Sequence, residues 1–323
     1  MGITSIIPHM KKKVFGIPTF VFYILLGVSL IGLLFGSLFD LQISKAVVDM
    51  DDPVANFYES YGLFFAHAEI EVIIVMLFVG LYKREKLAYR FMGYFILIAA
   101  NAVLIYIFHK FFWLNPNSKE ALFGFRYENR IVVIILSALS LIAIGVLTFF
   151  LLNKEEKMAN YVLFIGVMMT VALALRFGIG YILKDLGGRP RYRFIYSDIG
   201  GDYDGIHYSY RDWWEFAFWK HPRLDYFRSW PSGHTMNAGL TLLLVAFPSV
   251  LKKRFKGDVY VFMGVALAYT ATMMFYRIRV GAHYLSDVSM GLLISSVLVY
   301  LALFFSCQAM EKNKITIYNP ETF

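Results

Sequence analysis

The sequence predicts an all-α protein, a polytopic transmembrane bundle of about eight helices. Three observations lead to this fold class. Hydrophobic residues make up 59% of the 323 residues, and the mean hydropathy is +0.58. Charged residues make up 17%, against roughly 25% in soluble globular domains. The apolar residues also fall in long stretches that approach the roughly 20 residues a helix needs to cross a bilayer.

We expect one membrane helix in each of these stretches. They are residues 14–39, 61–82, 91–114, 131–153, 159–183, 233–251, 258–278 and 284–306. The first follows Lys11–Lys13 and is long enough to span, and no small-residue cleavage site comes after it. It is therefore predicted to be a membrane helix rather than a cleaved signal peptide.

The charges in the connections predict the orientation of the bundle. The connections at 83–90, 153–160 and 252–258 are rich in Lys and Arg, whereas the connection at 40–60 is acidic. By the positive-inside rule, both termini and the basic connections face the cytoplasm. The predicted location is a bacterial plasma membrane, with 307–323 as a cytoplasmic tail.

The formal net charge of +8 does not predict nucleic acid binding. The basic residues are spread over short clusters between apolar segments, which favours topology signals and an anionic substrate. The single cysteine, Cys307, excludes an intrachain disulfide.

The connection at 184–230 is predicted to face outward, yet it is strongly basic. Basic residues in an outward-facing connection do not follow the positive-inside rule, so they need another role, and we expect them to bind an anion. They are Lys184, Arg189, Arg191, Arg193, Arg211, Lys220, Arg223 and Arg228. Four of the five tryptophans also lie in this connection. We therefore expect it along the outer interface, either as an aromatic anchor or as a lid over a site.

Three groups of polar residues stand at outward ends of predicted helices. They are 184–192 after the fifth helix, 231–234 at the start of the sixth, and 277–287 between the seventh and the eighth. The distribution of Lys and Arg puts all three on the same face of the membrane. Cationic side chains suited to the oxygens of a phosphoryl group come from two of the groups. They are Lys184, Arg191 and Arg277.

The remaining polar residues of these groups fit the chemistry of phosphoryl transfer. At Ser232 and Gly233 a helix begins, where free backbone N–H groups and the positive end of the helix dipole favour an anion. His283 and Asp287 are four residues apart, so the carboxylate can fix the imidazole tautomer and leave the other ring nitrogen to attack. His234 is a second imidazole that can protonate a departing alkoxide.

Each group alone also has a structural interpretation. The PSGH sequence at 231–234 could be a helix cap, and His283 with Asp287 could be a structural pair. A single arginine near a helix end often reaches to the membrane interface. The three groups together, in order and on one face, favour the catalytic interpretation.

Together the three groups resemble the motifs of the type-2 phosphatidic acid phosphatase (PAP2) superfamily. The membrane branch of that superfamily contains lipid phosphate phosphatases and undecaprenyl-diphosphate phosphatases. The motifs read Lys184-DLGGRP-Arg191, then PSGH at 231–234, then Arg277-IRVGA-His283-YLS-Asp287. The resemblance covers about residues 170–306. It implies a metal-independent hydrolase that needs no cofactor and forms a phosphohistidine intermediate.

The resemblance also implies a role for each motif residue. It makes His283 the nucleophile, Asp287 the residue that orients it, and His234 the general acid. The implied phosphate-binding residues are Lys184, Arg191, Ser232, Gly233 and Arg277. We expect a PAP2-like core at 159–306, preceded by membrane helices at 1–158 that include an extra pair within 83–158.

The sequence departs from the family pattern at two positions. Tyr192 stands where the family has proline after the arginine, and Arg189 is the arginine that precedes a proline. Arg189 is therefore an alternative phosphate ligand, although the spacing favours Arg191. Tyr276 stands where the family has serine, and it exchanges one hydroxyl for a phenol.

Charged residues inside the predicted membrane helices require partners. His67 and Glu71 are four residues apart and could share an inward face, and Arg176 could join them. A structural ion pair and a proton or substrate path are both open for this set. The aspartates in DIGGDYDG (198–205) lack the downstream bidentate acid of a calcium loop, so no metal site is predicted.

The expected function is an integral membrane phosphatase that hydrolyses a lipid phosphate or diphosphate at the outer face. Its expected partners are that substrate and the membrane lipids, and no nucleic acid. The same site could instead pass the phosphoryl group to an acceptor other than water. A third alternative, from a different class, is a lipid transporter that uses the buried charges.

Overall fold

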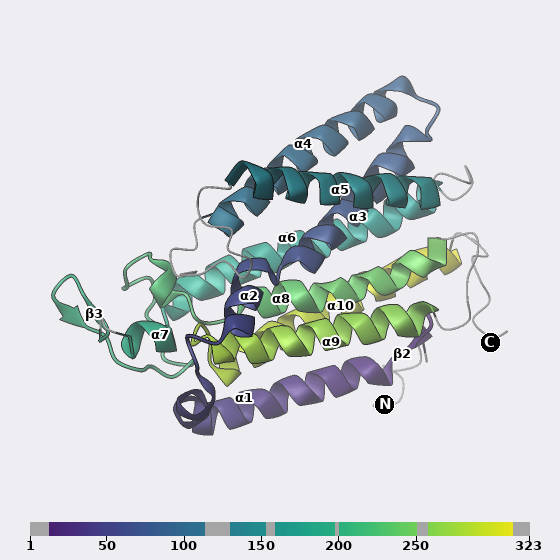
Figure 1. The fold of residues 1–323 in the computed structure, drawn as a ribbon. Coiled ribbons are helices and arrows are strands. Elements are labelled where there is room, and N and C mark those ends of the chain that lie inside the picture. The colour runs from purple at the N-terminus through teal and green to yellow at the C-terminus, as the bar shows by residue number, and fades with distance from the viewer. Residues whose placement is uncertain (1–12, 114–129, 153–158, 198–199, 251–257, 313–323) are drawn as a thin grey trace, which may run out of the picture.

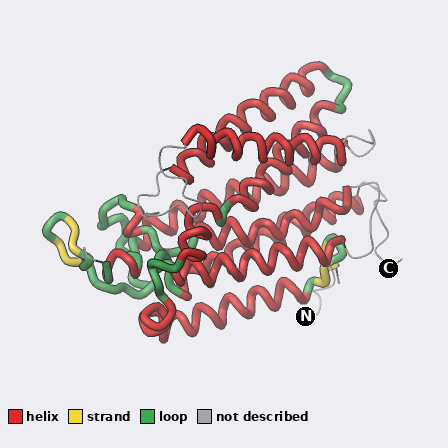
Figure 2. The backbone as a smooth tube through the Cα atoms, in the orientation of Figure 1, coloured by secondary structure: helices red, strands yellow, loops and turns green. Residues whose placement is uncertain are grey.

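The chain forms a bundle of long helices that run roughly side by side (Figures 1 and 2). This computed structural model describes residues 13–113, 130–152, 159–197, 200–250 and 258–312. A two-stranded antiparallel hairpin, β1 (Lys13–Val14) and β2 (Ile17–Pro18), precedes the first helix. The helices of the first half are α1 (Phe20–Val47), α2 (Pro53–Tyr61), α3 (Phe64–Tyr82), α4 (Leu87–Trp113) and α5 (Arg130–Leu152).

The second half contains the remaining helices and the polar connection. The long helix α6 (Ala159–Gly187) is followed by short elements and then by α8 and a 3₁₀ helix. The short elements are α7 (Tyr192–Ile195), the hairpin of β3 (Asp202–Tyr203) and β4 (Ile206–His207), and η4 (Asp225–Phe227). The others are α8 (Gly233–Leu240), η5 (Thr241–Val250), α9 (Asp258–Arg279) and α10 (Leu285–Lys312).

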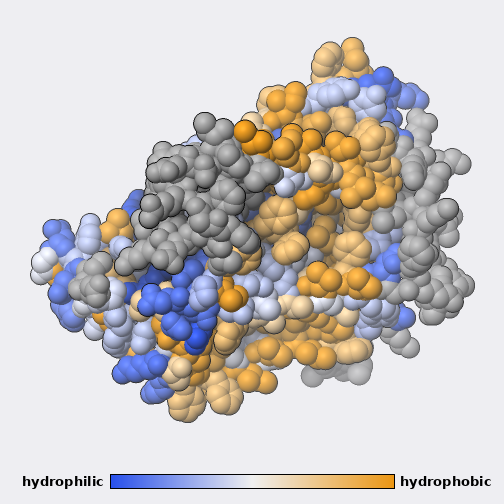
Figure 3. All heavy atoms as spheres, in the orientation of Figure 1, coloured by the Kyte–Doolittle hydropathy of each residue, from blue (hydrophilic) through white to orange (hydrophobic). Residues whose placement is uncertain are grey.

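The helical fold agrees with the predicted transmembrane bundle. Among the described residues, six helical segments are long and apolar enough to cross a membrane. They are Phe20–Val47, Pro53–Tyr82, Leu87–Tyr106, Ala159–Ile195, Asp258–Arg279 and Leu285–Ala309. The other two predicted spans correspond to α5 and to α8 followed by η5. Figure 3 shows hydrophobic side chains over the flank of the helices and hydrophilic ones at the end that carries β3 and α7.

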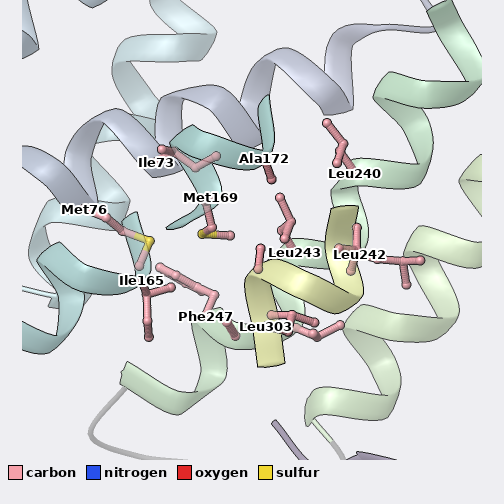
Figure 4. Packing of buried hydrophobic residues seen from close by; sticks show 14 of the residues in the cluster. Ile73, Met76, Ile165, Met169, Ala172, Leu240, Leu242, Leu243, Phe247 and Leu303 are labelled. Atoms are coloured by element: carbon pink, nitrogen blue, oxygen red, sulfur yellow. The ribbon is translucent and has the colours of Figure 1, made fainter. Parts of the chain in front are cut away.

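The largest apolar core lies between α3, α6, α8, η5 and α10. Met76 of α3, Met169 of α6 and Leu243 of η5 meet there, and each is at most 1% exposed. Figure 4 shows these side chains interleaved. Because lipid tails are as apolar as these side chains, helix association in a membrane depends on close packing. Gly80 of α3 illustrates this, because a Cβ there would overlap the backbone of Leu163 in α6.

The two halves of the chain share one bundle. Helix α1 packs along α10, α2 packs on α9, and α3 packs on α6. Helices α4 and α5 fall within 83–158, where an extra pair is predicted; they pack mainly on α3 and lie at the edge of the bundle away from α1 and α9 (Figure 1). The first half therefore supplies neighbours to the second half through α1, α2 and α3.

Two predicted boundaries are wrong for physical reasons that bear on the site. The first helix begins at Phe20 rather than at residue 14, and it ends at Val47 rather than at 39. The predicted acidic loop 40–60 is mostly helical, since α2 begins at Pro53, directly after its cap residue Asp52. Asp52 accepts the backbone N–H groups of Val54 and Ala55, each at 2.9 Å. The acidic residues of 40–60 predicted a loop that faces water. Asp40 and Glu59 are instead buried and form ion pairs with the buried side chains of Arg189 and Arg193.

Candidate active site

The three predicted polar groups meet at one end of the bundle. This end carries α7, opposite the end that holds β1 and β2 (Figure 2). The backbone N–H of Ser232 donates to the carbonyl oxygen of Asp287 at 3.0 Å, which joins the second group to the third. Nη1 of Arg191 donates to the carbonyl oxygen of Ala282 at 3.2 Å, which joins the first group to the third. The predicted convergence of distant segments is therefore present.

The PSGH segment begins a helix, as predicted. Ser232 is the N-cap of α8, and its Oγ accepts the Thr235 N–H at 3.4 Å and the Thr235 hydroxyl at 3.0 Å. A glycine follows because there is little room for a side chain: a Cβ at residue 233 would lie 3.1 Å from Nη2 of Arg176 and 3.6 Å from Cε of Lys184. The first turn of α8 therefore lies against two cationic side chains.

Arg176, which the sequence left open as a partner of His67 and Glu71, bonds the start of α8 instead. Its Nη2 donates to the carbonyl oxygen of Gly233 at 2.6 Å, so the arginine supports the start of α8. Nδ1 of His67 lies 2.7 Å from the carbonyl oxygen of Leu63, one turn earlier in the chain. Arg176 and His67 each have a backbone carbonyl oxygen as partner, because an unsatisfied polar group is costly at membrane depth.

His283 and Asp287 are both buried at the junction of α9 and α10. Nδ1 of His283 lies 3.6 Å from Oδ2 of Asp287, slightly beyond hydrogen-bonding distance. The same carboxylate oxygen accepts the Tyr284 N–H at 2.8 Å and the Ser229 hydroxyl at 2.5 Å. Burial, together with the nearby charges of Arg191 and Arg277, lowers the pKa of His283 below its ordinary value. The ring is therefore neutral at physiological pH, which is the form that can attack an electrophile.

Three cations surround the two imidazoles. Cε of Lys184 lies 3.6 Å from the Cβ position of residue 233, Arg191 bonds the carbonyl oxygen of Ala282 at 3.2 Å, and the His283 N–H donates to the carbonyl oxygen of Arg277 at 3.1 Å. Nζ of Lys184 donates to the carbonyl oxygen of Arg228 at 2.6 Å. Arg277 is 2% exposed; its Nε has no hydrogen-bond partner among the described residues, and its Nη1 has the Glu59 carboxylate only as an ion-pair partner at 3.4 Å. Buried donors of this kind suit an anion with several oxygens.

The structure distinguishes the two arginines between which the sequence left a choice. Arg191 contacts the third polar group and holds Asp225: its Nη2 donates to Oδ1 at 2.8 Å and its Nε to the carbonyl oxygen at 2.9 Å. Arg189 instead bonds the buried carboxylates of Asp40 and Asp287. Arg191 therefore lies beside the histidine motif, and its role as a phosphate ligand stays a prediction.

The two tyrosines that depart from the family pattern pack against other rings. The ring centroids of Tyr192 and Tyr196 are 4.5 Å apart. The ring of Tyr276 stacks on that of Tyr58, also with 4.5 Å between the centroids. Tyr276 thus links α9 to α2, a helix from the first half of the chain.

Sequence reasoning missed two acidic residues that hold the site arginines. Asp40 bonds Arg189, and Glu59 bonds Arg193 at 2.5 Å and lies 3.4 Å from Nη1 of Arg277. Both carboxylates are buried and lie outside the three motifs. The available signal was their position, since Asp40 ends a long apolar stretch and a charge there needs a buried partner.

The segment 213–219, which holds three tryptophans, packs beside the site. The N–H groups of Ala217, Phe218 and Trp219 donate to carbonyl oxygens of the last turn of α6, at 2.9–3.2 Å. Gly188, with φ +56°, follows that turn, and the left-handed backbone there favours glycine. The side chains of Phe218 and Trp219 remain exposed, at 58% and 54%. This segment therefore presents exposed aromatic rings beside the C-terminal end of α6.

Comparison with known families gives a match over the second half of the chain. The family model described as the PAP2 superfamily matches residues 161–311. No curated protein and no solved structure matches the chain. The matched range contains all three motifs together with the helices that carry them, α6, α8, α9 and α10. Residues 161–311 of this membrane-spanning chain therefore form a domain of the PAP2 superfamily.

Proposed function

We propose that the chain is an integral membrane phosphatase that hydrolyses a lipid phosphate or diphosphate through a phosphohistidine intermediate. The observation that carries the proposal is that Lys184, Arg191 and Arg277 lie beside the two histidines. Lys184 packs against Gly233, Arg191 bonds the carbonyl oxygen of Ala282, and the His283 N–H donates to the carbonyl oxygen of Arg277. A domain of the PAP2 superfamily and helices suited to crossing a membrane fit a membrane phosphatase.

In the first step the buried cations and the N–H groups at the start of α8 bind the phosphoryl oxygens. Nδ1 of His283 faces Asp287, which leaves Nε2 to attack phosphorus. The N–P bond forms as the bond to the leaving oxygen breaks, and that oxygen receives, through His234, the proton that the phosphate monoanion brings into the site. Negative charge that develops on the equatorial oxygens is neutralised by fixed cations, the largest source of catalysis for this chemistry.

In the second step water attacks the phosphorus of the phosphohistidine. The N–P bond breaks, inorganic phosphate leaves, and His234 takes the proton of the attacking water. Asp287 stabilises the positively charged imidazole in between. Its position is fixed by the Tyr284 N–H and the Ser229 hydroxyl, so little reorganisation is needed during the reaction.

The surroundings of the site support a lipid substrate. The site lies at one end of the spanning helices, beside the exposed rings of Phe218 and Trp219. Aromatic side chains favour the headgroup region, where the phosphate of a lipid is also located. The charge of the connections supports an outward-facing site, with both termini in the cytoplasm of a bacterium.

The decisive test compares phosphate release by the wild-type protein and by His283→Ala. Purified protein in detergent is offered a panel of phosphatidate, phosphatidylglycerophosphate, a polyprenyl diphosphate and a lipid A phosphate. We expect release from at least one of them, and a loss of roughly 10³-fold or more in kcat for His283→Ala. A protein labelled with ³²P should carry an acid-labile phosphate on wild type only.

A matched control for this test is His207→Ala. His207 is a histidine of the β3–β4 hairpin whose side chain is 66% exposed and pairs with Asp202. It should retain wild-type activity. Equal release by wild type and His283→Ala would refute the phosphohistidine mechanism. Recovery of the phosphoryl group on an added alcohol instead of as free phosphate would identify a phosphotransferase, and lipid movement that survives loss of both histidines would identify a transporter.

A further inference from the structure

A buried cluster of charged side chains lies behind the predicted catalytic carboxylate. Nη1 of Arg189 donates to Oδ1 of Asp287 at 2.6 Å, and Nη2 of Arg189 donates to Oδ2 of Asp40 at 2.9 Å. The three side chains are 0–1% exposed. One arginine therefore joins the residue that faces His283 to a residue of α1.

Every nitrogen of the Arg189 guanidinium has an acceptor. Nε donates to the carbonyl oxygen of Arg211 at 2.7 Å, and Nη1 also donates to Oγ of Ser286 at 2.8 Å. Nη2 also donates to the Tyr210 hydroxyl at 3.1 Å. A buried ion cluster is stable only when its remaining hydrogen bonds are satisfied, and this one meets that condition.

Asp40 also fixes the start of α10. Its Oδ1 accepts the backbone N–H of Ser286 at 2.9 Å, and its Oδ2 accepts the Ser286 hydroxyl. Ser286 is the second residue of α10 and the neighbour of Asp287. A carboxylate at a helix N-terminus satisfies free N–H groups and complements the helix dipole. Asp40 thus acts on the backbone that carries Asp287 as well as on its carboxylate.

Helix α1 approaches α10 closely at this level. Gly32, Gly36 and Asp40 are spaced by four residues, so they lie on one face of α1. A Cβ at residue 36 would lie 2.7 Å from the backbone nitrogen of Ser286, closer than real Cβ contacts. Small residues at this spacing let two membrane helices approach each other. The glycines therefore allow the Asp40 carboxylate to reach α10.

The charges indicate what Asp40 contributes. Arg189 alone beside Asp287 would neutralise the carboxylate that must stabilise a positive imidazole on His283. With Asp40 present, two carboxylates share one guanidinium, so Asp287 retains negative character toward the histidine. The arginine meanwhile holds the Asp287 side chain in place.

We infer that Asp40 is a positioning residue of the active site, acting through Arg189 and Ser286 on Asp287 and thereby on His283. This inference rests on the proposed function. Asp40 lies outside the matched range 161–311, so the catalytic centre is completed by a helix that precedes the PAP2 domain.

The first test is Asp40→Asn, which keeps the shape of the side chain and removes its charge. We expect kcat to fall about tenfold, the low end for partners that orient a functional group. KM should stay unchanged, because the phosphate-binding cations are not touched. The matched control is Asp51→Asn, an exposed aspartate that follows α1 and should behave as wild type. Equal kcat in Asp40→Asn and Asp51→Asn would overturn the inference.

A double-mutant cycle distinguishes positioning from a general structural role. In an Asp287→Asn background, Asp40→Asn should lower kcat further by less than about twofold, because the group through which it acts is already lost. An equal tenfold effect in both backgrounds would show that Asp40 only supports the fold, and would overturn the inference.

A milder variant covers the case in which Asp40→Asn does not fold. Ser286→Ala removes the hydroxyl contacts with Asp40 and Arg189 but keeps all charges, and should lower kcat about threefold with KM unchanged. An unchanged kcat in Ser286→Ala would then count against the inference. A wild-type protein that releases no phosphate from the panel would refute the proposed function and the inference together. If the wild type is active and His283→Ala is inactive, the proposed function holds, and the Asp40 and Ser286 variants then test the inference alone.

Discussion

Arg189 and Arg191 are two residues apart and both are buried, yet their surroundings differ in kind. Arg189 faces two carboxylates that are themselves fully buried, Asp40 and Asp287. Arg191 faces Asp225, whose side chain is 72% exposed. The first arginine is enclosed on the α1–α10 side of the site, and the second opens toward the connection between α6 and α8. The exposure of the partner carboxylate, rather than that of the arginine, separates the two roles.

This difference has an energetic meaning. Breaking a buried ion pair leaves an uncompensated charge and is strongly destabilising. The Arg191–Asp225 pair is buried on the arginine side only, so water can reach the carboxylate and breaking the pair should cost less than breaking a fully buried one. Arg189 is therefore suited to hold a fixed geometry. Arg191 can exchange the Asp225 carboxylate for an incoming phosphoryl group without a large loss of stability.

The largest expected effect is that of Arg189→Gln. Removal of the guanidinium leaves Asp40 and Asp287 buried beside each other without a cation. We expect a loss of about 3–5 kcal/mol in the free energy of unfolding. Thermal unfolding of the detergent-solubilised protein measures this loss, with the exposed Arg223→Gln as control. A midpoint equal to that of the control would remove the basis for calling Arg189 a structural arginine.

Arg191→Gln should have the next largest effect, and on activity more than on stability. Loss of one charged donor to the phosphoryl oxygens should lower kcat/KM by about 10²–10³-fold. Its unfolding midpoint should fall by less than that of Arg189→Gln, since its partner carboxylate is exposed. If Arg191→Gln were the less stable and the more active of the two variants, the assignment of the two arginines would be reversed.

The smallest effect is expected for Asp225→Asn. The stability should change by about 0–1 kcal/mol, as is usual for an ion pair with an exposed partner. Because the carboxylate no longer competes for Arg191, inorganic phosphate should inhibit the variant more strongly than it inhibits wild type. Product-inhibition constants measure this change. Weaker inhibition in the variant would mean that Asp225 aids phosphate binding and does not occupy its place.

Much of the fold follows from hydropathy alone, for a reason specific to membranes. A backbone in lipid must satisfy its own hydrogen bonds, so a long apolar stretch is restricted to a helix. The stretches at 61–82 and 258–278 correspond closely to Phe64–Tyr82 and Asp258–Arg279. The end of the first helix was missed because Asp40 was taken as a sign of water, whereas it is paired with Arg189 inside the bundle.

The sequence by itself determined the membrane bundle, the three motifs and their arrival at one face, because periodicity, helix signals and charge distribution are local properties. It left Arg189 and Arg191 as alternatives, since two arginines near a helix end have the same local pattern. Only the tertiary structure decided which of them faces the histidines. It also brought Asp40 and Glu59 from α1 and α2 to the site. A buried charge is defined by its partner, and these partners are 149 and 134 residues away along the chain.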